Sequence, residues 1–142
     1  MSADLFDCLM ETIFTEKKPE KPRIYHEQLN NYEIFKAFEQ KRNEAFKDNR
    51  LMTQILDFVG CKDLSSSIYK ELMHRGIVKK EGVCYVLDGK YEGIYGQTYV
   101  KYRGGNKAHR AINWYFKGFD LILGMVRDRV KRPLTINLEM KF

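Results

Sequence analysis

The hydrophobic pattern of this chain changes from a helical period to a strand period close to Gly76. Before this glycine, apolar residues recur every three to four positions, as on the buried face of a helix. After it they alternate in short runs rich in valine, isoleucine and tyrosine, as in β-strands. We therefore expect an α+β domain with its helices first and a strand-forming region after them. No apolar run approaches the ~18–20 residues that a membrane span needs, so we expect no membrane segment.

Three helices are expected before the change of period, over residues 30–47, 51–59 and 65–75. An asparagine can cap the first, and a serine at position 65 can cap the third. Gly76 then supplies a left-handed residue, and Ile77 can fold back onto the helix as the hydrophobic contact of a Schellman-type end. The last two helices, joined by a glycine-containing turn, are typical of a helix-turn-helix.

The strand-forming region contains two turn signals. Residues 83–87 are rich in β-formers and are followed by Asp88-Gly89, which predicts a two-residue hairpin turn. Further strands are expected over 94–102 and 111–116, joined by a glycine-rich basic turn at 103–107. The sequence thus places at least one β-hairpin directly after the helix-turn-helix.

The C-terminal part is expected to close the domain with a helix from about 119 to 129. Helices, a hairpin and a final helix, in this order, predict a winged helix-turn-helix with an added C-terminal helix. We place this domain at residues 30–132. Residues 133–142 are expected to form a tail or an edge strand, because Pro133 suits the start of such a strand.

Residues 1–29 are expected to form an extension of this domain. Within them, residues 2–14 carry apolar side chains at helical spacing and predict a short amphipathic helix. Two of the three prolines and several charges follow, which is typical of a linker. Such a short helix is marginal alone in water, so we expect it to pair with a second copy of the chain or with another partner.

Positive charge is concentrated in the last third of the chain. Residues 1–95 carry 15 Lys+Arg against 16 Asp+Glu, a net of −1, whereas residues 96–142 carry 10 against 3, a net of +7. This asymmetry favours a polyanionic partner, and double-stranded DNA is the partner that we expect.

The stretch from Ile55 to Lys80 resembles the helix-turn-helix of phage antirepressor C-terminal domains of the KilA type (KilAC). It shares a helix that ends in glycine, a short turn into a leucine-containing helix, and a basic-Gly-Ile ending at Arg75-Gly76-Ile77. The resemblance extends over roughly residues 50–130. It implies a winged helix-turn-helix from a phage or mobile element that acts as a transcriptional regulator or antirepressor. The serines at 65–67 replace the Gly-Arg-rich opening of the family's second helix.

The second turn and its flanks are the strongest candidate DNA-binding surface. Cations at a hairpin tip can lie along phosphates and release counterions, and nearby glycines allow the backbone to approach. The alternative is a loop that is basic only because it is solvated. The candidate residues are Lys101, Arg103, Lys107, His109 and Arg110.

The third helix supplies the other half of the candidate surface. Serine and lysine side chains can hold phosphate oxygens, and an arginine can contact guanine with two hydrogen bonds. The candidates here are Ser66, Ser67, Lys70, His74 and Arg75.

Two arginines near the end of the last helix, Arg127 and Arg129, complete the candidate set. They could form a third phosphate clamp. They could equally be the cations that favour any helix C-terminus.

No catalytic, cofactor or metal site is expected. The three cysteines, Cys8, Cys61 and Cys84, are far apart and odd in number, which excludes a disulfide framework and a zinc module built from paired cysteines. Cys84 could ligate zinc together with His74 or His109. It lies in an alternating apolar strand, however, and we therefore expect a buried thiol.

These observations predict a non-enzymatic, cytoplasmic, double-stranded DNA-binding protein, located in the host cytoplasm or nucleoid if it is viral. The alternative is a small viral interaction protein, either a virion component or an inhibitor of a host factor. In that case the basic C-terminal third would meet an acidic protein surface or packaged nucleic acid.

Overall fold

The structure of the chain is a computed structural model that describes residues 29–102 and 108–142. The helix expected over 2–14, the linker after it and the 103–107 turn lie outside these ranges. Within them the fold is mixed α+β, with four α-helices and two small antiparallel sheets, so the predicted fold class is confirmed at this level. No helix among the described residues is long and apolar enough to cross a membrane.

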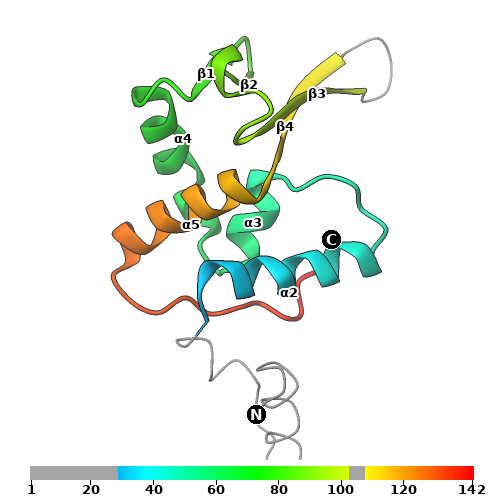
Figure 1. Cartoon of the computed structure of the whole chain (residues 1–142), viewed down its shortest axis with the longest axis vertical. Coiled ribbons are helices and arrows are strands. Elements are labelled where there is room, and N and C mark those ends of the chain that lie inside the picture. The colour runs from blue at the N-terminus through cyan, green and yellow to red at the C-terminus, as the bar shows by residue number, and fades with distance from the viewer. Residues whose placement is uncertain (1–28, 103–107) are drawn as a thin grey trace, which may run out of the picture.

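Two hairpins and helix α4 lie at one end of the molecule, and helix α2 and the C-terminal segment lie at the other (Figure 1). Helix α5 runs between the two ends. The α-helices are α2 (Asn31–Glu44), α3 (Met52–Phe58), α4 (Ser65–His74) and α5 (Phe116–Val130), and the strands are β1 (Val78–Glu81), β2 (Cys84–Leu87), β3 (Gly96–Tyr102) and β4 (Ala108–Trp114). Short 3-10 helices, η2 (Lys62–Leu64) and η3 (Gly89–Tyr91), precede α4 and follow β2.

The predicted helix ends are largely confirmed by their caps. At the start of α2, the Glu33 backbone N–H donates to Asn30 Oδ1 (2.8 Å) and the Asn30 N–H donates to Glu33 Oε1 (2.9 Å). At the end of α4, Gly76 has φ +77° and the Ile77 N–H donates to the Leu72 carbonyl (3.0 Å), which is a Schellman motif.

The predicted N-cap of α4 is wrong. Ser65 is already the first residue of the helix, and Leu64 occupies the cap position without a side-chain hydrogen bond. The reason is that η2 leads directly into α4 and leaves no extended residue between them.

The first hairpin pairs β1 with β2 from Val78↔Leu87 to Glu81↔Cys84, and it turns at Gly82, where φ is +64°. The prediction of a hairpin turn at Asp88-Gly89 is therefore wrong. Instead, Asp88 starts η3, because its carboxylate accepts a hydrogen bond from the Lys90 N–H (3.2 Å).

The second hairpin pairs β3 with β4 from Gly96↔Trp114 to Tyr102↔Ala108. It lies beside the first hairpin (Figure 1). The Leu87 N–H donates to Thr98 Oγ1 at 3.0 Å, so contacts between the hairpins are partly polar.

The hydrophobic core lies among α2, α3, α5 and the base of β4. Its largest fully buried side chains include Trp114, Phe38, Phe58 and Phe119. The start of α5 lies very close to the backbone of Tyr95. A Cβ on Gly118 would lie 2.2 Å from the Tyr95 carbonyl oxygen, so only glycine fits there.

The C-terminal segment 131–142 belongs to this core. Leu134, Ile136 and Met140 are buried, and the Asn137 N–H donates to the Phe58 carbonyl (2.7 Å). The segment contains no strand. Of the two alternatives, the tail is observed and the edge strand is wrong, because the segment is held by buried apolar side chains and the bond to Phe58 without a strand ladder.

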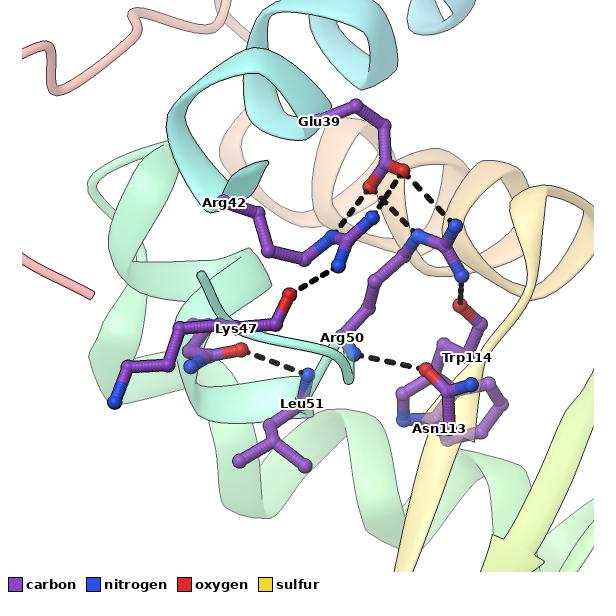
Figure 2. Close-up of polar contacts among 8 residues, drawn as sticks. Glu39, Arg42, Lys47, Arg50, Leu51, Asn113 and Trp114 are labelled. Carbon is purple, nitrogen blue, oxygen red and sulfur yellow. Dashed lines mark hydrogen bonds and ion pairs between the residues drawn. The ribbon is translucent and has the colours of Figure 1, made fainter. Parts of the chain in front are cut away.

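One carboxylate ties α2 to β4 through the connection before α3 (Figure 2). Glu39 accepts two hydrogen bonds from Arg42 (2.7 and 3.0 Å) and two from Arg50 (2.7 and 2.9 Å). Arg50 also donates from Nη1 to the Trp114 carbonyl (3.1 Å) and from its backbone to Asn113 Oδ1 (2.8 Å). The base of the second hairpin is thereby fixed to the helical body.

The environment of Glu39 favours its charged form. Burial raises the pKa of the carboxyl, but the hydrogen bonds and charges of Arg42 and Arg50 outweigh this effect and lower the pKa from 4.5 to about 2.

Candidate nucleic-acid interface

Helix α4 presents one open stripe to solvent. Ile68 and Leu72 are buried, and at about 100° per residue Lys70 lies on the opposite side of the helix. Ser66, Lys70 and His74 follow one another at four-residue spacing along this side, and all three are exposed. No ion pair holds Lys70 in the part of the chain that the structure describes, so its ammonium group is available to a ligand.

The neighbouring stripe of α4 is occupied by α5. Glu71 accepts a hydrogen bond from Arg129 Nη2 (2.6 Å) and forms an ion pair with Arg75. Arg129 Nε donates to Ser67 Oγ as well (2.9 Å). The hydrogen bonds from Arg129 and Arg75 lower the pKa of Glu71, against an opposing effect of burial. Two of the predicted DNA-contacting residues, Arg75 and Arg129, are therefore held by this glutamate, and a third, Ser67, is held by Arg129.

The β1–β2 hairpin follows α4 and adds two cations that sequence reasoning did not place in the site. Lys79 and Lys80 on β1 are exposed. The Lys80 ammonium lies 5.4 Å from the centre of the Tyr85 ring, and Tyr85 stacks on Tyr69 of α4 with 3.8 Å between ring centres. The signal for these lysines was a basic pair directly after the helix-ending Gly76-Ile77.

The Tyr69–Tyr85 stack fixes the hairpin against α4. Burial, with a further contribution from Tyr85, raises the pKa of Tyr69 above its usual range, so this phenol stays neutral at physiological pH. The lysines of β1 are thus held in a defined position relative to the open stripe.

The second hairpin divides the cations that the sequence grouped at its tip. Lys101 pairs with His109 across the strands, whereas Arg110 pairs with Val100. Since successive residues of a strand point to opposite faces, Lys101 and His109 share one face and Arg110 lies on the other. Arg110 also forms an ion pair with Glu81 of the first hairpin.

The remaining predicted residues are not brought to this surface by the described structure. Arg127 Nε donates to Asn31 Oδ1 (3.0 Å) and Nη2 donates to the Leu29 carbonyl (3.5 Å), so this arginine joins α5 to the start of α2. Arg103 and Lys107 lie outside the described residues.

The cysteine prediction needs a correction. Cys84 is partly exposed instead of buried, and its Sγ lies 3.8 Å from His109 Nδ1. The strand alternation failed here because Cys84 is the first residue of β2, beside the turn at Gly82. Within residues 29–102 and 108–142, no group of three or more His, Cys, Asp or Glu side chains could hold a metal ion.

Comparison of the chain with family models, with curated proteins and with solved structures finds no match. The functional inference therefore rests on the side chains of the surface. Lys79 and Lys80 are successive residues of β1 and therefore point to opposite faces of the hairpin. Lys80 lies on the face of Tyr85, which contacts α4, so the surface consists of the open stripe of α4 (Ser66, Lys70, His74) and Lys80. We refer to it as the α4–β1 surface.

Proposed function

We propose that the protein binds double-stranded DNA without catalysing a reaction, as a winged helix-turn-helix in which α4 lies in the major groove and a hairpin lies on the phosphate backbone. The resemblance to KilA-type antirepressor domains extends this proposal to a transcriptional regulator or antirepressor of a phage or mobile element.

The arrangement of α3, α4 and the β1–β2 hairpin supports the proposal. A second helix after a glycine-containing turn, followed at once by a two-stranded hairpin, has the element order of a winged helix-turn-helix. The observation that carries the proposal is the α4–β1 surface itself. Its two lysines, Lys70 and Lys80, are exposed and form no ion pair among the described residues, and its α4 stripe carries no acidic side chain.

The pattern of ion pairs refines how this surface would recognise DNA. Lysine binds phosphates as a point charge, whereas arginine makes the paired hydrogen bonds that identify guanine. Arg75 is the C-cap residue of α4, and Glu71 holds it. Affinity would therefore come mainly from phosphate contacts by Lys70 and Lys80, and base contacts would fall to Ser66 and His74.

The salt dependence of binding tests the proposal. Each neutralised phosphate contributes about 0.9 to the slope of log K against log salt, so two lysines predict an affinity loss of about 12-fold between 50 and 200 mM salt. Fluorescence anisotropy of a labelled duplex measures this directly. An affinity that does not change with salt, or no binding at 50 mM salt, would contradict the proposal.

A charge reversal localises the binding surface. We expect Lys70→Glu to weaken duplex binding at least tenfold, because it places a negative charge at the centre of the open stripe. Lys36→Glu on α2 is the matched control: this lysine is also exposed, and it lies on the helix at the other end of the molecule (Figure 1). Equal losses in the two variants would show that only net charge matters.

Dimerisation belongs to the same proposal. Two copies joined through residues 2–14 would bind a pseudo-palindromic site, with α4 of each copy in successive major grooves. We expect deletion of residues 2–14 to reduce affinity for such a site. Unchanged affinity would exclude that role for the segment.

A second candidate function is docking on an acidic protein surface, as a virion component or an inhibitor of a host factor. Exposed apolar side chains beside the cations favour it: Val83 at the first turn is 79% exposed and Val100 on β3 is 51% exposed. A partner protein that co-purifies without nucleic acid would support this candidate over DNA binding.

A further inference from the structure

A thiol and an imidazole meet at the seam between the two hairpins. Cys84 comes from β2 and His109 from β4, and the thiol Sγ lies 3.8 Å from the imidazole Nδ1. The Arg110 backbone N–H donates to the same sulfur at 3.4 Å. Both side chains are partly exposed, so a small molecule can reach the sulfur.

The other described cysteine has the opposite environment. Cys61 is 2% exposed, and its thiol donates to the Val59 carbonyl (3.5 Å). Burial is the largest influence on this thiol and raises its pKa. A buried thiol that stays protonated is a poor nucleophile. Cys61 therefore provides an unreactive reference within the same chain.

We propose that Cys84 is a reactive thiol, with His109 as its base, that forms mixed disulfides with small disulfides of the glutathione type. A nucleophile and a base within hydrogen-bond reach form the arrangement that activates a cysteine. The Arg110 N–H is aimed at the sulfur and stabilises the negative charge that develops on it.

The exchange is balanced as follows. His109 takes the proton of the Cys84 thiol, and the sulfur attacks one sulfur atom of the small disulfide. A new S–S bond forms as the original S–S bond breaks, and the second half of the small disulfide leaves as a thiolate that takes up the proton. No other oxidant is needed, because the small disulfide itself accepts the two electrons.

Cations beside the seam favour an anionic disulfide. His109 shares its face of the hairpin with Lys101, and Glu81, the acidic residue opposite Cys84 in the first hairpin, is paired with Arg110. The inference does not depend on the proposed function, since it concerns the reactivity of one thiol whether or not the chain binds DNA.

The test uses the full chain carrying Cys8→Ser, so that Cys61 and Cys84 are its thiols. The protein is incubated with oxidised glutathione at pH 7, and peptide mapping by mass spectrometry measures the rate at each cysteine. We expect Cys84 to react at least tenfold faster than Cys61. His109→Gln should slow Cys84 at least threefold, whereas Lys36→Gln, which alters an exposed side chain on α2, should leave the rate unchanged.

Cys61 also reports whether the variant remains folded. If His109→Gln opened the structure, Cys61 would become faster, so its unchanged rate is required for the comparison. In urea the rates of Cys84 in the wild type and in the variant should converge. Equal Cys84 rates in the folded wild type and folded variant, or a Cys61 as fast as Cys84, would overturn the proposal.

Discussion

Two glutamates of this protein each bind two arginines, and they do so in different surroundings. Glu39 has a side chain that is 19% exposed, and its arginines, Arg42 and Arg50, also donate to backbone carbonyls (Figure 2). Glu71 is 26% exposed and joins Arg75 to Arg129 on the surface of α4 and α5.

The two clusters have different roles. Glu39 connects α2 to the residues before α3 and, through Arg50, to the end of β4, so its contribution is to the stability of the fold. Glu71 connects two helices that also pack through apolar side chains, and its main effect is to neutralise cations beside the α4–β1 surface. The same local chemistry thus serves stability at one site and the charge of a surface at the other.

The largest expected difference between the two glutamates is in the free energy of unfolding, and it is measured by removing one carboxylate at a time. Glu39→Gln leaves two partly buried guanidinium groups without a counter-ion, and we expect it to lower the free energy of unfolding by about 2–3 kcal/mol. Glu71→Gln should cost less than about 1 kcal/mol, as is usual for ion pairs near the surface. Urea denaturation measures both values, and equal losses would contradict the distinction.

Acid should act through Glu39 as well. Its pKa is about 2 in the folded protein against 4.5 ordinarily, so its stabilising contribution is complete above pH 4.5 and is lost as the pH falls from 4.5 towards 2. At about 1.4 kcal/mol per pKa unit, the loss is at most about 3–4 kcal/mol. Stability measured at pH 5 and at pH 3 should differ more in the wild type than in Glu39→Gln. A variant with the same acid dependence as the wild type would exclude Glu39 as the cause.

Removing the charge of Glu71 should strengthen DNA binding, although it lowers the stability of the fold slightly. Glu71→Gln frees Arg75 and Arg129 and removes a negative charge beside the open stripe, so we expect duplex DNA to bind about fivefold more tightly, on the order of 1 kcal/mol. Glu44→Gln on α2, an equal change of charge at an exposed position on another helix, should leave affinity nearly unchanged. Weaker binding by Glu71→Gln would show that the cluster itself holds the DNA-binding conformation.

The smallest expected effect concerns the stability of the backbone just after α2. Phe46 lies just after α2 with φ +56° and is 91% exposed, a position and conformation that glycine would occupy without strain. Phe46→Gly should therefore raise the melting temperature slightly, corresponding to about 0.5–1 kcal/mol. A lower melting temperature would mean that the phenyl ring makes contacts that stabilise the fold.

Local signals in the sequence predicted much of the fold. The asparagine cap and the glycine at 76 act over a few residues, and the helices that they delimit are present. The turn at Gly82 and the buried C-terminal segment were missed. Asp88-Gly89 suits two local structures equally well, and Leu134 and Ile136 are buried by contacts with residues far away in the sequence.

The candidate site was harder to predict. Whether a cation is free to bind DNA depends on its ion pairs with residues far away in the sequence. Glu71 and Arg129 are 58 positions apart, and Glu81 and Arg110 are 29 apart. No periodicity along the chain shows that these cations have partners. A count of basic residues therefore identified a positive region and could not identify which cations in it are free.

Protection of individual lysines by DNA tests directly whether duplex DNA binds to the α4–β1 surface. The protein is acetylated briefly with and without excess duplex DNA, and mass spectrometry measures the modification of each lysine. We expect DNA to protect Lys70 and Lys80 while Lys36 stays as reactive as in the free protein. Protection of Lys36 without protection of Lys70, or no protection of any lysine, would contradict it.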